Sequence, residues 1–310
     1  MLGNPKMSAI FSSSLLFFSL NASAASAEIA PDLVPIKCFM CDGWNKPRAP
    51  FKIFGNSYYV GVAGLSALLI AGKRGHVLLD GALPQSAPII QRNIESLGFK
   101  MIDVKWILVS HAHFDHAGGV AALQRISGAK VAGSKLAASA LKFGFPPTND
   151  PQFGYGEANR FAKIAAPQAI NDGTDVRIGE LSVRLHDTPG HTPGGASYSW
   201  QSCEAKKCLT MVYADSISSV SSPDFRFSNR PKLLGNFERS FKLIAGMDCD
   251  VMISTHPDVS QFFERFEAYA SGKPGELLNS SSCKDYAQLA REKLALRLQS
   301  EANDSPKLKK

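Results

Sequence analysis

The chain has 310 residues, of which 45% are hydrophobic and 20% are charged. This composition is typical of a globular protein and excludes a fibre, a disordered chain and a membrane channel. Lys and Arg outnumber Asp and Glu by 34 to 27, which gives a net charge of +7, but the basic residues are scattered. Because nucleic-acid binding needs basic side chains clustered on one face, we expect no dedicated nucleic-acid-binding protein.

The first 27 residues have the pattern of a secretory signal peptide. A short positively charged start is followed by a largely apolar run at residues 9–20 and then by small residues. Ala25-Ser26-Ala27 predicts cleavage before Glu28, and Ala22-Ser23-Ala24 is the other candidate. A membrane anchor is the alternative, but an apolar core of about a dozen residues is shorter than the roughly 20 that span a bilayer. We expect a periplasmic or secreted protein, in which residues 28–310 form a single domain.

In the mature chain, strand-like runs alternate with helical patterns in both halves. Short runs rich in Val, Leu, Ile and Tyr predict strands, and apolar residues that recur every three to four positions predict helices. In chain order, the first half has strands at 58–61, 67–70 and 77–80, a helix at 86–97, a strand at 104–110, a helix at 119–126, a strand at 129–132 and a helix at 134–141. The second half has strands at 181–185, 196–200 and 209–213, a helix at 232–245, a strand at 251–254 and helices at 260–269 and 282–298. Strands flanked by helices in both halves predict one compact α/β unit.

All six cysteines lie after the predicted signal peptide, and an even number in an exported protein indicates disulfide bonds. Short separations favour the first two of three pairs and leave the third: Cys38–Cys41, Cys203–Cys208 and Cys249–Cys283. The third bond would stabilise the fold by about 3–4 kcal/mol in the chain-entropy model. The alternative for Cys38 and Cys41 is half of a zinc ribbon or a redox pair, although the sequence context of neither is evident.

Most of the candidate chemistry lies in His111-Ala112-His113-Phe114-Asp115-His116, directly after the predicted strand 104–110. Three imidazoles and a carboxylate within six residues cannot share one face of a strand or a helix. A tight loop at the end of a strand can point all of them into one cavity. Imidazole and carboxylate groups suit zinc, so this motif predicts a metal site.

Two further histidines follow predicted strands in the same way. His191 lies in the turn Thr188-Pro189-Gly190-His191, and His256 comes just after the strand 251–254. Sites are usually built where loops leave strand ends, so both are candidate ligands. The loop-rich stretch 144–156, with three prolines and three glycines, is the candidate for an active-site lid.

The remaining two histidines are weaker candidates. His76 lies at the start of a predicted strand and His186 lies inside one. We expect both to be packed or surface residues rather than metal ligands.

These motifs resemble the metallo-β-lactamase superfamily: His-x-His-x-Asp-His, a later Thr-Pro-Gly-His and a final His after a strand. The resemblance implies an α/β fold, a four-layer αββα sandwich with two sheets inside, helices outside and the metals at one edge. The motif separates members of the superfamily poorly, since glyoxalase II, lactonases, sulfatases and nucleases carry it too. In two of the three β-lactamase subclasses a Cys binds the second zinc, whereas the matching stretch here, Tyr213 to Ser218, has no Cys. The chain therefore resembles class B β-lactamases of the third subclass over nearly all of its mature length.

That resemblance implies a cofactor of two zinc ions per chain. The implied ligands of the first are His111, His113 and His191, and those of the second are Asp115, His116 and His256. Asp115 would also orient the zinc-bound hydroxide. This hydroxide would open the amide bond of penicillins, cephalosporins and carbapenems, so we expect a hydrolase that confers antibiotic resistance.

The resemblance also implies substrate-binding residues and disulfides. Ser216 and Ser218 would bind the substrate carboxylate, and Trp44, Gln152 and Phe153 would line the pocket. The spacing of Cys249 and Cys283 matches a disulfide of the subclass, and that of Cys203 and Cys208 matches one in some members. Cys38 and Cys41 depart from the N-terminal disulfide of some members, whose partner would fall near Val62-Ala63.

Several other functions are open at this point. The closest is a lactonase or a glyoxalase II-like thioesterase, which usually has a metal-bridging Asp on the strand before the last His. Asp215, beside Ser216, is the candidate for that role. A nuclease would need a basic clamp or an added domain, and an exported zinc-binding protein would need a closed metal site. A serine β-lactamase would need Ser-x-x-Lys opening a buried helix, but the match at Ser281-Ser282-Cys283-Lys284 lacks the companion motifs. We expect a β-lactam as the small-molecule partner, neither nucleic acid nor membrane after signal cleavage, and a monomer.

Overall fold

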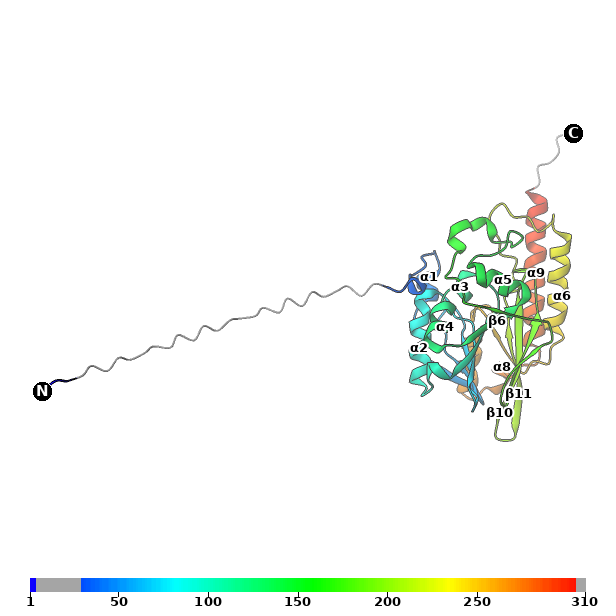
Figure 1. The fold of residues 1–310 in the computed structure, drawn as a ribbon. Coiled ribbons are helices and arrows are strands. Elements are labelled where there is room, and N and C mark those ends of the chain that lie inside the picture. The colour runs from blue at the N-terminus through cyan, green and yellow to red at the C-terminus, as the bar shows by residue number, and fades with distance from the viewer. Residues whose placement is uncertain (4–28, 305–310) are drawn as a thin grey trace.

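The structure is a computed structural model of the chain and describes residues 1–3 and 29–304. The predicted signal peptide and its cleavage site therefore lie almost wholly outside the described residues. From residue 29 onward, two β-sheets pack face to face, and helices cover the outer face of each sheet (Figure 1). This arrangement confirms the predicted four-layer αββα sandwich of the α/β class.

The first sheet has seven strands that lie side by side in the order of the sequence. Pairing is antiparallel from β1 to β4 and parallel from β4 to β7. Parallel neighbours need long crossovers, and the helices α2, α4 and α5 lie in the three crossovers. The strands are β1 (Phe51–Phe54), β2 (Ser57–Tyr59), β3 (Leu68–Ile70), β4 (His76–Leu79), β5 (Val104–Leu108), β6 (Lys130–Ser134) and β7 (Gln168–Ile170), and the helices are α2 (Ala87–Ser96), α4 (Val120–Ser127) and α5 (Lys135–Phe143).

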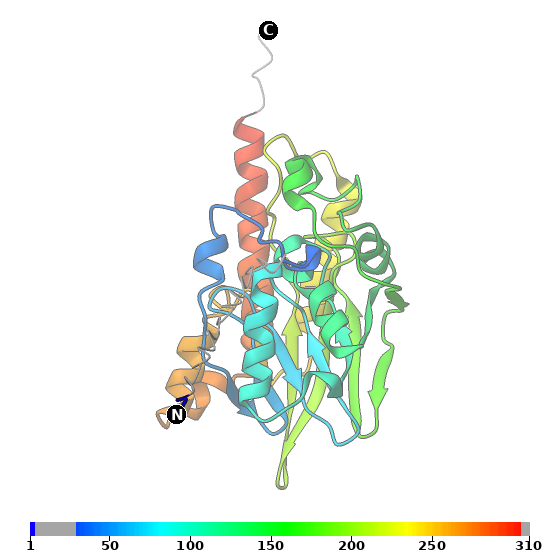
Figure 2. The ribbon, with the colours of Figure 1, turned by 60° about the vertical axis from the view of Figure 1, so that its left-hand side comes forward.

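The second sheet has five strands in the order β12-β11-β10-β9-β8. All neighbours are antiparallel except β11 and β12, which run parallel because α6 crosses between them. Helix α6 packs beside the long C-terminal helix α9 on the outer face of this sheet (Figures 1 and 2). The elements are β8 (Asp175–Ile178), β9 (Leu181–Asp187), β10 (Ala196–Glu204), β11 (Lys207–Ala214), α6 (Pro231–Ala245), β12 (Val251–Ser254), α7 (Phe262–Ala270), α8 (Pro274–Leu277) and α9 (Ser282–Asn303).

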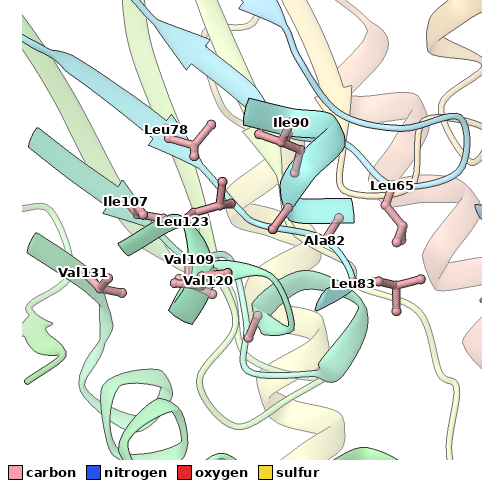
Figure 3. Close-up of a cluster of buried hydrophobic side chains, with 14 of the residues drawn as sticks. Leu65, Leu78, Ala82, Leu83, Ile90, Ile107, Val109, Val120, Leu123 and Val131 are labelled. Atoms are coloured by element: carbon pink, nitrogen blue, oxygen red, sulfur yellow. The ribbon is translucent and has the colours of Figure 1, made fainter. Parts of the chain in front are cut away.

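Alternation of side chains along the strands builds the layers. On β4, Leu78 packs under the helices, whereas Val77 and Leu79 fill the space between the sheets. Figure 3 shows Leu78 gathered with Ile90 of α2 and Leu123 of α4. Because central strands are buried on both faces, they read as nearly continuous apolar runs, which made them visible in the sequence.

Three disulfide bonds join Cys38 to Cys41, Cys203 to Cys208, and Cys249 to Cys283. They match the three predicted pairs. With both sulfur atoms in a bond, Cys38 and Cys41 offer no thiolate for half of a zinc ribbon. The Cys203–Cys208 bond closes the long hairpin of β10 and β11, where the two cysteines face each other in register.

The predicted lid is a defined loop that holds a 3-10 segment, η4 (Phe153–Asn159). Two smaller 3-10 segments precede β5, η2 (Pro84–Ser86) and η3 (Met101–Asp103), and a third, η1 (Pro31–Leu33), lies near the start of the described chain. The short helix α1 (Cys41–Trp44) follows η1. Among the described residues, none of the helices combines the length and the apolar character that crossing a membrane requires.

Candidate metal centre

The six predicted metal ligands come together at one edge of the sandwich. His111 and His113 lie just beyond the end of β5, and the one-turn helix α3 (Phe114–Ala117) carries Asp115 and His116. His191 lies in the turn between β9 and β10, and His256 lies two residues beyond β12. The ligands thus lie in the segments that follow strand ends, and the arrangement of the strands brings these distant segments of the chain together.

His111, His113 and His191 form the first group. One nitrogen of each lies within 4.8 Å of the others, and the three side chains are buried. Their ring centroids are 4.8 to 5.0 Å apart. The Nε2 atom of His111 is buried without a hydrogen-bond partner. Since a buried unpaired nitrogen is costly, this geometry fits a bound cation.

Asp115, His116 and His256 form the second group. The Asp115 Oδ2 atom lies 3.4 Å from His116 Nε2 and 3.4 Å from His256 Nε2, and these two nitrogens are 3.2 Å apart. Ligand atoms of His111, Asp115 and His116 also lie within 4.8 Å of one another, so the two groups are neighbours. The donor set is imidazole and carboxylate throughout, which fits zinc.

Each of the five histidines also meets an oxygen atom through its other ring nitrogen. The contacts are His111 Nδ1 with Asp215 Oδ1 at 2.7 Å, His113 Nε2 with Asp150 Oδ1 at 3.1 Å, His116 Nδ1 with Asp80 Oδ2 at 3.4 Å, His191 Nδ1 with the Ser218 carbonyl at 3.0 Å and His256 Nδ1 with the Gly64 carbonyl at 3.2 Å. Oxygen acceptors of this kind hold the rings of metal-binding histidines in place and make them more basic. At His116 the contact is an ion-pair distance only, because its Nδ1 atom has no hydrogen-bond partner among the described residues.

Electrostatics favours the ligand form of His111, His191 and Asp115. His116 is the exception, because its burial is outweighed by the Asp115 and Asp80 carboxylates, which raise its pKa to about 10. Burial, with a further contribution from His113, lowers the pKa of His191 to about 3. Burial and the nearby imidazoles hold the pKa of His111 well below its ordinary value. Burial alone would raise the pKa of Asp115, but the His116 and His256 imidazoles outweigh it and hold that pKa well below its usual range. Neutral imidazoles and an ionised carboxylate are the forms that bind a metal.

Asp215 contacts His111 on the Nδ1 side of its ring. Its carboxyl is fully buried, and the Oδ1 atom accepts the hydrogen bond from His111 Nδ1. Its backbone carbonyl accepts a hydrogen bond of 2.9 Å from the Tyr286 hydroxyl. The structure therefore shows Asp215 as a support of His111.

A cavity of about 470 Å³ opens over the metal centre and is lined by Asp115, His191 and His256. Four of the five predicted substrate residues line it too: Trp44, Gln152, Ser216 and Ser218. The Trp44 ring lies 5.1 Å from that of His256, and Gln152 Nε2 lies 3.3 Å from His113 Nδ1 and from His191 Nε2.

Phe153 is the fifth predicted substrate residue, and it does not line this cavity. Its ring packs against Phe145, at a centroid distance of 5.6 Å, and borders a neighbouring hollow. The η4 segment begins at Phe153, so the backbone turns there and separates it from Gln152. His76 packs edge-on against Phe99, and His186 pairs with Ser199, so both lie outside the centre as expected.

Sequence reasoning missed several residues that the structure brings to the centre. Asp80 and Asp150 support ligands from segments with no motif. Three further residues line the cavity: Met40, from the loop that the Cys38–Cys41 bond closes, and Leu289 and Lys293, from α9. The helical pattern at 282–298 indicated a helix but not which of its faces meets a cavity.

Comparisons with known proteins agree with the fold and the ligand pattern described above. A family model described as the metallo-beta-lactamase superfamily matches residues 60–204. The solved structure of the Rm3 metallo-beta-lactamase is 45% identical, with a TM-score of 0.82, over 86% of this chain and 99% of that one. MEM-A1, a subclass B3 metallo-beta-lactamase from a soil metagenome library, is 43% identical, with a TM-score of 0.81, over 84% of this chain and 100% of that one.

A curated hydroxyacylglutathione hydrolase of Bradyrhizobium sp. (strain ORS 278) is 32% identical over 138 residues. The match covers 44% of this chain and 42% of the relative, so this chain spans less than half the length of that curated relative.

Proposed function

This chain belongs to the subclass B3 metallo-β-lactamases, and we propose that it hydrolyses the amide bond of β-lactam antibiotics with two zinc ions. One observation carries the proposal: six donor side chains from distant segments converge in two adjacent groups beneath an open cavity. The first ion would be held by His111, His113 and His191, and the second by Asp115, His116 and His256.

When bound, zinc acts as a Lewis acid toward the β-lactam carbonyl and makes a nearby water more acidic. Asp115 would orient the attacking water, since its ionised carboxylate lines the cavity and can accept a hydrogen bond. Gln152 and Trp44 would form the walls beside the reacting amide. Phe153 lies outside this cavity and would act from the rim of the loop.

Ser216 and Ser218 would bind the carboxylate of the β-lactam nucleus. The Ser218 hydroxyl lies 3.1 Å from His191 Nδ1, and the Ser216 hydroxyl lies 2.8 Å from that of Thr255. A hydroxyl that accepts one hydrogen bond keeps its own proton for another partner. Both serines line the cavity, so each can donate that proton to the substrate.

The test is hydrolysis of nitrocefin and imipenem by the purified protein. We expect turnover of both, loss of turnover after exhaustive chelation and recovery when zinc is added back. Metal analysis should give two zinc ions per chain. Activity that persists after complete removal of the metal would contradict the proposal. Imipenem turnover decides separately whether the enzyme is a carbapenemase.

A thioesterase is the alternative that the curated relatives raise. It is disfavoured because Asp215, the candidate bridging carboxylate, is committed to His111. Including S-lactoylglutathione in the same assay separates the two functions. Hydrolysis of the thioester without hydrolysis of either β-lactam would reverse our assignment.

We also propose that the protein is exported, that residues 1–27 are removed and that residues 28–310 act as a single-domain monomer. Three disulfide bonds support export, because such bonds persist in oxidising compartments. Mass spectrometry of periplasmic and culture fractions should find a mature N-terminus at Glu28. Light scattering should give the mass of one chain.

A further inference from the structure

We propose that the cavity continues from the metal centre along α9 into a second subsite, which binds an apolar side arm of the β-lactam that carries a carboxylate. In this proposal the ammonium group of Lys293 forms an ion pair with that carboxylate. The inference rests on the proposed function, because it names the β-lactams that the same site prefers.

One face of α9 forms a wall of the cavity. Tyr286, Leu289, Ala290 and Lys293 line it, at the spacing that places residues on the same side of a helix. At a rise of about 1.5 Å per residue, Tyr286 and Lys293 lie about 10 Å apart along the helix axis. The wall is therefore long enough to hold a substituent in addition to the reacting ring.

Two hydrogen bonds fix how α9 lies against the segment that follows β11. The Tyr286 hydroxyl donates to the Asp215 carbonyl at 2.9 Å, and Arg297 Nη2 donates to Ser221 Oγ at 3.1 Å. Residues 216–220 therefore run alongside the stretch of α9 between these two contacts. Tyr286 marks the end of the wall beside the metal centre, and Lys293 lies toward the other end.

Several of the side chains that line the cavity are apolar and yet exposed to solvent. Met40, Val220, Val259 and Leu289 are each between 39% and 48% exposed, and all four line this cavity. Exposed apolar groups that gather in one hollow indicate a ligand that covers them. An apolar side arm would remove them from water.

The charged side chains differ between the two ends of the cavity. Lys293 is exposed and has no acidic partner within ion-pair distance among residues 29–304. Within the described part of the chain, it is the one Lys or Arg that lines the cavity, whereas Asp258 lies near the other end, two residues after His256. Lys293 therefore favours an anionic group at its own end of the cavity. The carboxylate of the β-lactam nucleus stays a few bonds from the reacting carbonyl, so the group that reaches Lys293 belongs to the side arm.

The test compares two penicillins that differ by one side-arm carboxylate, benzylpenicillin and carbenicillin. Replacing Lys293 by Ala (Lys293→Ala) should lower kcat/KM for carbenicillin about 5-fold or more, and that for benzylpenicillin less than about 2-fold. Lys293→Arg keeps the charge and should retain most of the carbenicillin activity. Lys284→Ala removes an exposed lysine of the same helix that lies outside the cavity lining and should change neither value.

An equal loss for both penicillins would overturn the inference, since Lys293 would then act on the nucleus or on the fold. No loss for either would also overturn it. If the wild-type protein hydrolyses neither penicillin, the proposed function fails, and binding decides the subsite independently. Tryptophan fluorescence, with Trp44 in the cavity, then follows titration with phenylmalonate and phenylacetate. Tighter binding of phenylmalonate that Lys293→Ala abolishes supports the subsite, and equal affinities contradict it.

Discussion

Oxygen atoms hold the metal-binding histidines from behind, and three of those oxygens belong to buried carboxylates, Asp80, Asp150 and Asp215. A free imidazole can rotate and change which nitrogen carries the proton. An acceptor on one nitrogen keeps the other available for the metal. The residues that matter at this scale thus include several that never touch the metal.

Asp215 provides the sharpest test of this role. We expect Asp215→Ala to weaken zinc binding about 10- to 100-fold, because His111 loses its acceptor, while two zinc ions per chain still bind at saturation. Asp215→Asn keeps an acceptor oxygen and should lose less. Competition with a chromophoric chelator measures the affinity, and metal analysis gives the stoichiometry. A drop from two ions to one would show that Asp215 is itself a ligand, as in the thioesterase alternative.

Asp115 tests the second group. Replacement by Ala removes a ligand and the acceptor that would orient water, so we expect weaker binding of the second zinc and turnover at least about 10²-fold lower. Nitrocefin kinetics at saturating zinc separate the two effects. Turnover that is fully restored by excess zinc would show that Asp115 only holds the metal.

At the scale of elements, the end of α9 is clamped to the loop that precedes α6. Glu301 accepts hydrogen bonds of 2.9 Å from the backbone of Phe227 and Ser228 and an ion pair of 2.9 Å from Arg297. Arg226 also contacts the Glu301 carbonyl. The same helix forms a wall of the cavity, so this clamp holds the wall in place.

The clamp predicts a dependence of stability on pH. Burial raises the pKa of Glu301, but the hydrogen bonds from Ser228 and Phe227 and the Arg297 charge outweigh it and lower that pKa to about 2. A lowered pKa stabilises the fold above the ordinary value of 4.5, and this stabilisation is lost as pH falls from about 4.5 toward 2. We expect Glu301→Gln to cost up to about 3 kcal/mol at pH 7 and roughly half of that or less at pH 3. Urea unfolding at the two pH values measures this, and an equal cost at both would contradict it.

Whether an element could be predicted from the sequence depends on how much of it is buried. Strands β4 and β12 are buried at every position, and β5 is buried at three of its five, so all three stood out as apolar runs, although β12 lies at the edge of its sheet. The edge strands β7 and β8 keep exposed polar residues and have no counterpart in the prediction. The motif around His111 indicated the site because its chemistry is local. The contributions of Asp150 and Lys293 depend on tertiary contacts, which no local pattern encodes.

At the scale of the whole molecule, the metal centre joins the two sheets. His111, His113 and the α3 ligands follow a strand of the first sheet, whereas His191 and His256 follow strands of the second. Bound zinc therefore links the two halves of the sandwich at one edge. Without metal, the same edge holds three buried imidazoles in close contact, and the Nε2 atom of His111 has no hydrogen-bond partner among the described residues, which is unfavourable.

This linkage predicts that metal binding stabilises the fold. Two ions, each at 1,000 times its Kd, together contribute about 8 kcal/mol, which for a chain of this size corresponds to a Tm shift on the order of 10 °C. We expect chelation to lower Tm by about that amount in the wild-type protein. His256→Ala removes one ligand of the second group and should reduce the shift to roughly half. Calorimetry of matched loaded and chelated samples measures both. An unchanged Tm after verified removal of zinc would mean that the sheets hold together without it, and that the metal serves catalysis alone.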